Sequence, residues 1–167
     1  MRKAEFGGTL IDIPEQCKQG GYVNKIYLIG SLRNPQVPKL ANELRNLGYT
    51  VFDDWFAAGE IADDAWRDYE QDRGHNFREA LKGYAANHVF DFDMHHLNES
   101  TIGFLLLPAG KSGHLELGYL IGRGCKSYIV YPEEPERFDV MYLMADAVFG
   151  SEAELLEYLK LTLDKSS

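Results

Sequence analysis

The sequence predicts an α/β protein, a single domain built on an open, mostly parallel sheet of about five strands with helices on both faces. Apolar, β-rich runs such as KIYLIG (25–30) and TIGFLLLP (101–108) are continuous rather than alternating, as expected of strands that are buried on both faces. Segments with helical periodicity separate these runs, and such alternation is typical of parallel sheets. The length of 167 residues suits one domain of this kind.

Each element has its own signal. Strands are expected at apolar runs that end in Gly, Pro or acidic residues: 25–30, 50–56, 101–108 and 127–132, with a possible edge strand before 150. Helices are expected between them: from Pro38 to Gly48, over 57–99 with a break near Gly74, within 110–124 after a short loop, and over 151–163. Ser151 and Glu154 have the spacing of a capping box at the start of the last helix.

The domain is expected to span 23–167, because residues 1–22 show no clear period and read as an irregular lead-in with one short strand at most. The arrangement is of the Rossmann- or flavodoxin-like type, in which ligands bind outside the carboxyl ends of the strands. Four segments are therefore expected around one crevice: Gly30–Asn34, Asp53–Phe56, Pro108–His114 and Pro132–Met141.

The composition excludes some classes of partner. The formal net charge is −9, from 26 acidic and 17 basic side chains, whereas a surface that binds duplex nucleic acid needs clustered Lys and Arg. No segment approaches the ~20 apolar residues of a membrane span, and the first residues lack the apolar run of a signal peptide. Cys17 and Cys125 match no metal or redox spacing. We expect a soluble, cytoplasmic protein with reduced cysteines and no membrane partner.

The segment GKSGHLELGYLIGRG (110–124) places one carboxylate, Glu116, inside an apolar run. With Ser112 as the N-cap, Glu116 falls in the first or second turn of a helix that leaves the carboxyl edge of the sheet. The helix dipole there favours the ionised form, and the apolar neighbours disfavour it. Such a carboxylate can attack an electrophilic sugar carbon if it faces the crevice, or merely interact with the dipole if it faces solvent. The pattern alone leaves both interpretations open.

Four short motifs are more specific in their order than any one of them alone: IYLIG (26–30), DFD (91–93), LELGY (115–119) and DVMYLMAD (139–146). Placed on a βα frame, they resemble the nucleoside 2-deoxyribosyltransferase family and its relatives, the 2'-deoxynucleoside 5'-phosphate N-hydrolases. The similarity covers roughly residues 24–160, nearly the whole chain beyond the lead-in.

The resemblance implies catalytic roles for three residues. Glu116 matches the family's catalytic Glu, which attacks the anomeric carbon. Tyr27 matches the Tyr whose hydroxyl orients that carboxylate, and Asp93 matches the Asp that assists the base or its proton transfer. Asp139 and Met141 fall where a neighbouring subunit completes the pocket, which implies a homo-oligomer, a dimer or larger, with shared active sites.

The resemblance gives two indications about the 5' end of the substrate. Gly30, Ser31 and Arg33 reproduce the G-S-x-R of the hydrolases, where backbone donors and an Arg fork would suit a phosphate. The alternative for Arg33 is a pairing with surface carboxylates. Asp139 stands where the hydrolases have a phosphate-contacting Ser, and a carboxylate repels a phosphate but accepts a hydrogen bond from a free hydroxyl. We expect a free 5'-hydroxyl by a narrow margin.

Base recognition has weaker signals. The base-reading Asp of the transferases, six residues before the Glu, is Gly110 here, which leaves Ser112 and His114 as the nearby polar candidates. Asp53, at the end of a predicted strand, is a further candidate for ligand contact, with capping or a solvated loop as the alternative.

The sequence thus predicts an enzyme that cleaves or transfers the N-glycosidic bond of 2'-deoxyribonucleosides, with a small-molecule nucleoside or nucleotide as ligand. A hydrolase of 2'-deoxynucleoside 5'-monophosphates is the first alternative. There are two further alternatives. One is a nucleotide sensor without turnover. The other is a glycohydrolase of a larger nucleotide such as NAD, with the 57–87 insertion enlarging or covering the pocket. We expect no cofactor and no metal, since the adjacent His95 and His96 lack partners at ligand spacing.

Overall fold

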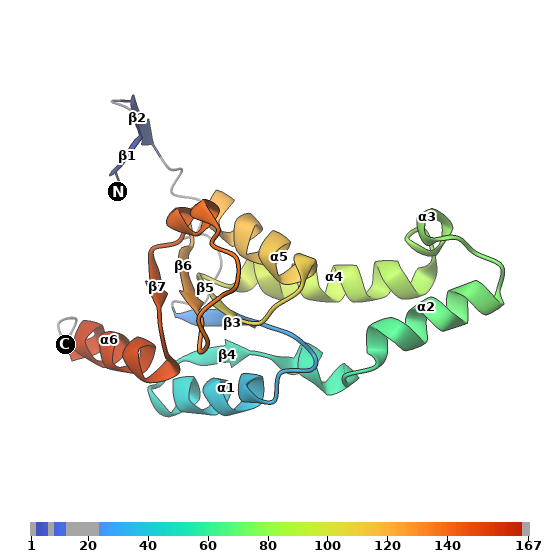
Figure 1. Ribbon diagram of the computed structural model, residues 1–167, viewed down its shortest axis with the longest axis horizontal. Helices are drawn as coiled ribbons and strands as arrows, with labels where there is room; N and C mark the ends of the chain where they lie inside the picture. The colour runs from blue at the N-terminus through green and yellow to red at the C-terminus, as the bar shows by residue number, and fades with distance from the viewer. Residues whose placement is uncertain (1–2, 7–8, 13–23, 165–167) are drawn as a thin grey trace.

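The computed structural model describes residues 3–6, 9–12 and 24–164, and it confirms the predicted fold class. A five-stranded, all-parallel sheet in the order β4-β3-β5-β6-β7 forms the centre of the molecule (Figure 1). Numbered within this sheet alone, the order is 2-1-3-4-5, which is that of a doubly wound sheet whose direction of winding reverses between β3 and β5.

The strands of this sheet are short and mostly buried: β3 (Lys25–Ile29), β4 (Thr50–Phe52), β5 (Ile102–Leu106), β6 (Lys126–Val130) and β7 (Ala147–Phe149). The helices are α1 (Gln36–Asn46), α2 (Ala62–Asp72), α3 (Phe77–Ala80), α4 (Tyr84–Glu99), α5 (Lys111–Gly122) and α6 (Glu152–Asp164), and two 3-10 turns are η2 (Asp54–Ala58) and η3 (Val140–Met144). In the lead-in, two short strands, β1 (Lys3–Phe6) and β2 (Thr9–Asp12), pair antiparallel where at most one was expected.

Each face of the sheet carries an apolar cluster under its helices. Helices α1 and α6 cover one face, where Leu40, Leu44 and Leu155 are fully buried. Helices α4 and α5 cover the other face and bury Leu97 and Leu120 against it. Full burial of one such side chain contributes about 2 kcal/mol relative to exposure. The predicted arrangement of helices on both faces is therefore confirmed.

Two glycines allow helix α5 to lie unusually close to the sheet. A Cβ atom at Gly113 would stand 2.8 Å from Ile29 Cγ2, and one at Gly103 would stand 2.7 Å from Leu120 Cδ1. Neither distance is compatible with a real side chain without a shift of the packing. The close approach fixes the height of α5 over β3, and with it the position of Glu116.

The ends of two elements differ from the prediction, whereas a third agrees with it. β4 stops at Phe52 rather than continuing to Phe56, because the Phe56 N–H bonds back to the Asp53 carbonyl at 2.9 Å and turns the chain into η2. The N-cap of α5 is Gly110 in an extended conformation, so Ser112 lies inside the helix and is not its cap. At α6, Ser151 Oγ accepts from the Glu154 N–H at 3.1 Å as predicted.

The expectation of reduced cysteines is wrong for Cys125, which is disulfide-bonded. Cys17 and most of the lead-in lie outside the described residues. Within the described part of the chain, no helix is long and apolar enough to cross a membrane.

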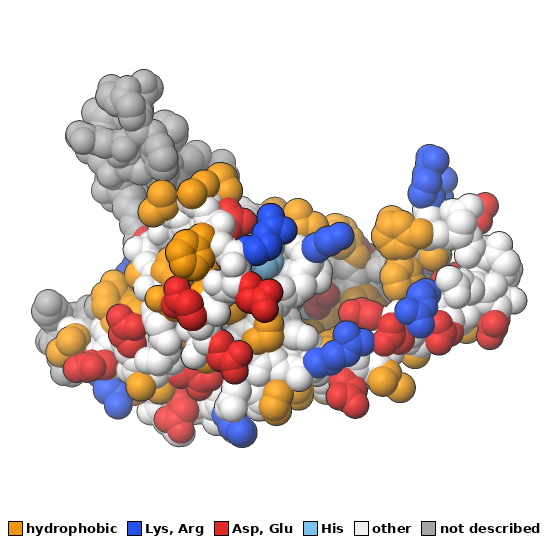
Figure 2. Space-filling model, in the orientation of Figure 1, with side chains coloured by type: hydrophobic (Ala, Val, Ile, Leu, Met, Phe, Trp, Pro, Cys, Tyr) orange, Lys and Arg blue, Asp and Glu red, His pale blue; other side chains and the backbone are white. Residues whose placement is uncertain are grey.

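The predicted helical segment 57–87 forms an arm that extends away from the sheet (Figure 1). We use "arm" for α2, α3 and the first turns of α4. The break occurs at Gly74, as predicted, where φ is +78°. Figure 2 shows hydrophobic side chains gathered at the tip of this arm and over the η3 segment. In the arm, Phe77 is 69% exposed, and in the segment before η3 Phe138 is 82% exposed.

Candidate active site

Three elements bring the predicted catalytic residues to the same face of the sheet. Tyr27 lies in the middle of β3 and is 1% exposed, with its ring packed on Phe52 at 5.1 Å between centroids. Asp93 lies on α4 and Glu116 in the second turn of α5. The three groups are close enough to shift one another's pKa values. The structure thus brings these three predicted residues together.

Tyr27 interacts most directly with Asp93. Burial raises the pKa of the Tyr27 hydroxyl, the negative charges of Glu116 and Asp93 raise it further, and a hydrogen bond to Asp93 adds to the effect. Burial likewise raises the pKa of Asp93, while the bond from Tyr27 lowers it. The hydroxyl therefore donates to Asp93, whereas Glu116 affects Tyr27 only through its charge, which raises the pKa of the hydroxyl. The resemblance had placed this hydrogen bond on Glu116.

Glu116 borders the buried stripe of α5, three residues after Gly113 and four before Leu120. Burial, and after it the charge of Asp93, raises the pKa of Glu116 from 4.5 to about 8. Its carboxyl group is thus largely protonated at neutral pH. Because the charge of Asp93 disfavours ionisation of Glu116, the titrations of the two carboxyl groups are coupled.

Asp93 has a free acceptor at this cluster. Its Oδ1 atom is buried and has no hydrogen-bond partner among the described residues. A buried acceptor without a donor costs about 1–3 kcal/mol, and more if it is charged. A ligand that donates a hydrogen bond to Oδ1 would recover this free energy, which makes the atom a natural contact for a substrate.

The residues that were predicted to bind a phosphate, Gly30, Ser31 and Arg33, contact other residues of this chain instead. Arg33 forms an ion pair with Asp64 of α2 at 2.8 Å, so the alternative of pairing with a surface carboxylate is what the structure contains. Ser31 Oγ accepts from the Arg33 N–H at 3.1 Å. At Gly30 a Cβ would stand 2.7 Å from Val37 Cγ2, which gives this glycine a packing role. Asp64, which belongs to α2, was not among the predicted site residues.

Asp53 is paired with Arg45, a partner that was not predicted from the sequence. Its carboxylate forms a short ion pair with Arg45 of α1, and the same guanidinium donates to the Val51 carbonyl at 3.1 Å. The side chain of Asp53 is only 11% exposed. The contact ties α1 to the end of β4. The Asp53 side chain makes no capping hydrogen bond to η2, so neither capping nor a solvated loop, the predicted alternatives to ligand contact, describes its role.

His114 connects α5 to the η3 segment. One ring nitrogen lies 2.8 Å from the Gly110 carbonyl, and Nε2 lies 2.9 Å from the Tyr142 hydroxyl. Tyr142 was not among the predicted site residues, although it stands in the DVMY motif. It also lines a cavity of about 210 Å³ together with Asp139.

The other predicted contacts are exposed. Asp139 Oδ1 accepts from the Met141 N–H at 2.9 Å and so caps η3. Met141 is 60% exposed, and Ser112 is exposed on the first turn of α5. Within this chain, therefore, Asp139 lies beside Tyr142, and Tyr142 in turn contacts His114. Met141 faces outward.

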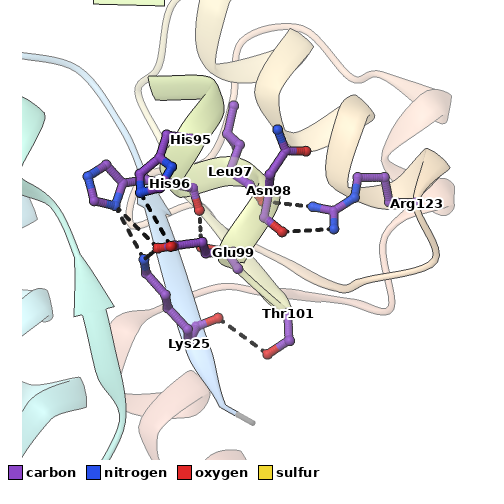
Figure 3. Close-up of polar contacts among 9 residues, drawn as sticks. Lys25, His95, His96, Leu97, Asn98, Glu99, Thr101 and Arg123 are labelled. Carbon is purple, nitrogen blue, oxygen red and sulfur yellow. Dashed lines mark hydrogen bonds and ion pairs between the residues drawn. The ribbon is translucent and has the colours of Figure 1, made fainter. Parts of the chain in front are cut away.

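The two histidines form part of a polar cluster at the start of β3 (Figure 3). Lys25 Nζ lies 2.5 Å from Glu99 and 3.2 Å from His96 Nδ1, and His95 Nε2 lies 3.3 Å from Glu99. The ligand atoms of His95, His96 and Glu99 lie within 4.8 Å of one another, a spacing that the sequence analysis missed. The Lys25 ammonium makes the contacts that a metal cation would make, and we interpret the cluster as a tie between α4 and β3.

The chain has an α/β fold of the nucleoside deoxyribosyltransferase type. No family model and no curated protein matches the sequence. Among solved structures, the chain is similar to a 2-deoxyribosyltransferase from the psychrotolerant bacterium Bacillus psychrosaccharolyticus, with 21% identity and a TM-score of 0.54 over 80% of this chain and 91% of that one. A CMP N-glycosidase from Clostridium botulinum gives 13% identity and a TM-score of 0.49 over 81% and 98%. At these identities the likeness is one of fold.

Proposed function

We propose that the protein cleaves or transfers the N-glycosidic bond of 2'-deoxyribonucleosides, with Glu116 as nucleophile. The observation that carries the proposal is the carboxyl pair of Glu116 and Asp93 beside Tyr27, with burial raising both carboxyl pKa values. A two-step glycosyl transfer requires two carboxyl groups, one that attacks the sugar carbon and one that transfers protons. A sensor that only binds a nucleotide has no need of such a pair.

The proton that Glu116 holds at rest has a use in this reaction. When substrate binds, the proton passes from Glu116 to Asp93 and on to the departing base. The Glu116 oxygen then bonds to C1', and the electron pair of the C1'–N bond leaves with the base. In the second step a water molecule or another base attacks C1', gives its proton to Asp93, and releases the Glu116 carboxylate. The charges and protons of both steps balance.

The direct test is incubation of the protein with a panel of 2'-deoxynucleosides and their 5'-monophosphates, with and without a second free base, followed by chromatography. We expect release of the free base, and formation of a new nucleoside when a second base is present. Binding without any product from the panel would indicate a sensor and contradict the proposal.

Tyr27→Phe should lower the rate about 10- to 100-fold, since loss of a charge-assisted hydrogen bond removes about 1.5–3 kcal/mol. Phe preserves the packing on Phe52. Because the Tyr27 bond lowers the pKa of Asp93, its removal should also move the acidic limb of the pH–rate profile to higher pH. Unchanged kinetics with an unchanged profile would show that Tyr27 serves only to pack the sheet.

At the 5' end of the substrate we propose a free hydroxyl. A phosphate would have to compete with Asp64 for Arg33. One carboxylate against one phosphate charge at ~4 Å costs roughly 4 kcal/mol at an effective dielectric constant of ~20, similar to what one Arg returns. A hydroxyl can donate to Asp139 without that opposition.

Accordingly, Asp139→Ser should raise the activity on monophosphates relative to nucleosides, and Arg33→Ala should reduce nucleoside cleavage by less than about threefold. The ratio of kcat/KM values for each substrate pair is the measurement. A wild-type protein that strongly prefers monophosphates, and loses that preference in Arg33→Ala, would support the N-hydrolase instead.

We further propose that the active unit is a homo-oligomer in which the η3 segment of one copy completes the site of another. Val140 is 76% exposed and Leu143 78% exposed, a density of apolar surface that association would bury. Val140→Asp should therefore shift the protein to smaller species in sedimentation and lower its activity. Leu161→Asp, at a position 57% exposed on α6, is the matched control. A monomer with full activity at the assay concentration would contradict shared sites.

A further inference from the structure

The tip of the arm contains a second cavity, apart from the candidate active site. It has a volume of about 110 Å³ and lies between α2, α3 and the turn that joins them. In Figure 1 this end of the arm stands clear of β3 and of the first turns of α5, which carry Tyr27 and Glu116. Its residues play no part in the proposed reaction.

A buried acceptor lines this cavity. The side chain of Glu70 is 3% exposed, and its Oε2 atom bonds to His75 Nδ1 at 2.6 Å. Its Oε1 atom is buried and has no hydrogen-bond partner within the described residues. The Arg73 guanidinium forms an ion pair with Oε1 at 3.7 Å but is beyond hydrogen-bonding distance. Buried polar groups are almost always paired in folded proteins, so this one requires an explanation.

A buried donor lines the same cavity. Trp66, one turn before Glu70 on α2, has its indole Nε1 atom buried and likewise without a partner in the described part of the chain. Residues four apart lie on the same face of a helix. Two residues that line the cavity thus each have a buried polar atom without a hydrogen bond to any described residue, an acceptor on Glu70 and a donor on Trp66. Phe77, 69% exposed, adds an aromatic wall.

We propose that this cavity binds a small planar heterocycle that carries an N–H donor beside a ring-nitrogen or carbonyl acceptor. The ligand N–H donates to Glu70 Oε1, its acceptor receives the Trp66 indole N–H, and its ring packs on Phe77. A simple cation would leave Trp66 unpaired, and an anion would be repelled by Glu70. The volume of about 110 Å³ lies below the ~150 Å³ of a cavity that holds benzene, so it limits the ligand to a single six-membered ring. The proposal is independent of the reaction at Glu116.

The location can be tested by nuclear magnetic resonance of the indole N–H groups, since the chain has two tryptophans. The Trp55 indole donates to the Leu28 carbonyl at 2.8 Å and serves as an internal control. Titration with 2-aminopyrimidine should shift the Trp66 resonance saturably and leave that of Trp55 in place. Trp66→Phe assigns the two signals.

The chemistry can be tested by calorimetry with a matched set of rings. We expect 2-aminopyrimidine to bind at least about tenfold more tightly than pyrimidine, which lacks the donor, or aniline, which lacks the ring acceptor. Glu70→Gln and Trp66→Phe should each weaken 2-aminopyrimidine by a similar factor. Asp72→Asn, an exposed change on the same helix, should not. If a variant fails to fold, the relative affinities of the three rings for the wild-type protein still test the proposal.

Three outcomes would overturn the proposal. One is an unmoved Trp66 resonance up to about 10 mM of 2-aminopyrimidine, where even millimolar affinity would be visible. Another is equal affinity for all three rings. The third is a Trp66 resonance that moves with protein concentration rather than with ligand, which would assign the cavity to contact with a second copy of the chain.

Discussion

Glu116→Gln is expected to reduce turnover of a 2'-deoxynucleoside by at least about a thousandfold, because it removes the group that forms the bond to C1' while keeping the shape of the side chain. The carboxyl group lies in the second turn of α5 beside Asp93 and Tyr27, and no other carboxylate of α5 can replace it. The measurement is kcat/KM by chromatography of the released base.

Glu43→Gln is the matched control, since Glu43 is an exposed carboxylate on α1, on the opposite face of the sheet. It should retain the wild-type rate. Activity within about tenfold of wild type in Glu116→Gln would show that Glu116 neither attacks the sugar nor transfers a proton in the rate-limiting step.

The same substitution should stabilise the protein at alkaline pH. The pKa of Glu116 is about 8 in the folded protein against an ordinary value of 4.5. Between these values the folded state holds a proton that the unfolded chain has released, so the free energy of unfolding falls as the pH rises from 4.5 to 8. Above pH 8 the full cost of the buried charge remains.

At about 1.4 kcal/mol per pH unit the upper bound of this cost is about 5 kcal/mol, and partial exposure of the side chain reduces it to about 2–4 kcal/mol. Gln is neutral throughout. Glu116→Gln should therefore unfold at higher urea concentration than wild type at pH 9, with little difference at pH 4.5. An equal difference at both pH values would show that Glu116 is not desolvated, and Glu43→Gln should show no pH-dependent difference.

The fold could be predicted because it depends on local patterns. The buried strands are continuous apolar runs, and the helix breaks fall at Gly48 and Gly74, where φ is positive. The end of β4 could not be predicted, because a single backbone hydrogen bond from Phe56 to Asp53 decides it. The start of α5 could not either, since Gly110 rather than a capping side chain provides the extended residue.

The candidate site was predictable in part for a similar reason. Glu116 is conspicuous as one carboxylate in an apolar run, and the motifs that resemble the transferases led to Tyr27 and Asp93. The partners of the polar residues depend on packing between distant segments, which no short motif records. Arg45 reaches Asp53 across α1 and β4, and the arm supplies the carboxylate that holds Arg33.

The most direct test of the central claim is to trap the glycosyl-enzyme. The protein is mixed with a 2'-deoxynucleoside, quenched in acid within the first turnover, digested with trypsin and analysed by mass spectrometry. The peptide from Ser112 to Arg123 contains a single carboxyl side chain, that of Glu116. We expect this peptide to gain the mass of one deoxyribosyl group, and the gain to be absent from Glu116→Gln. Base release with no adduct on this peptide at any quench time, or an adduct on another peptide, would contradict the assignment of Glu116 as the nucleophile.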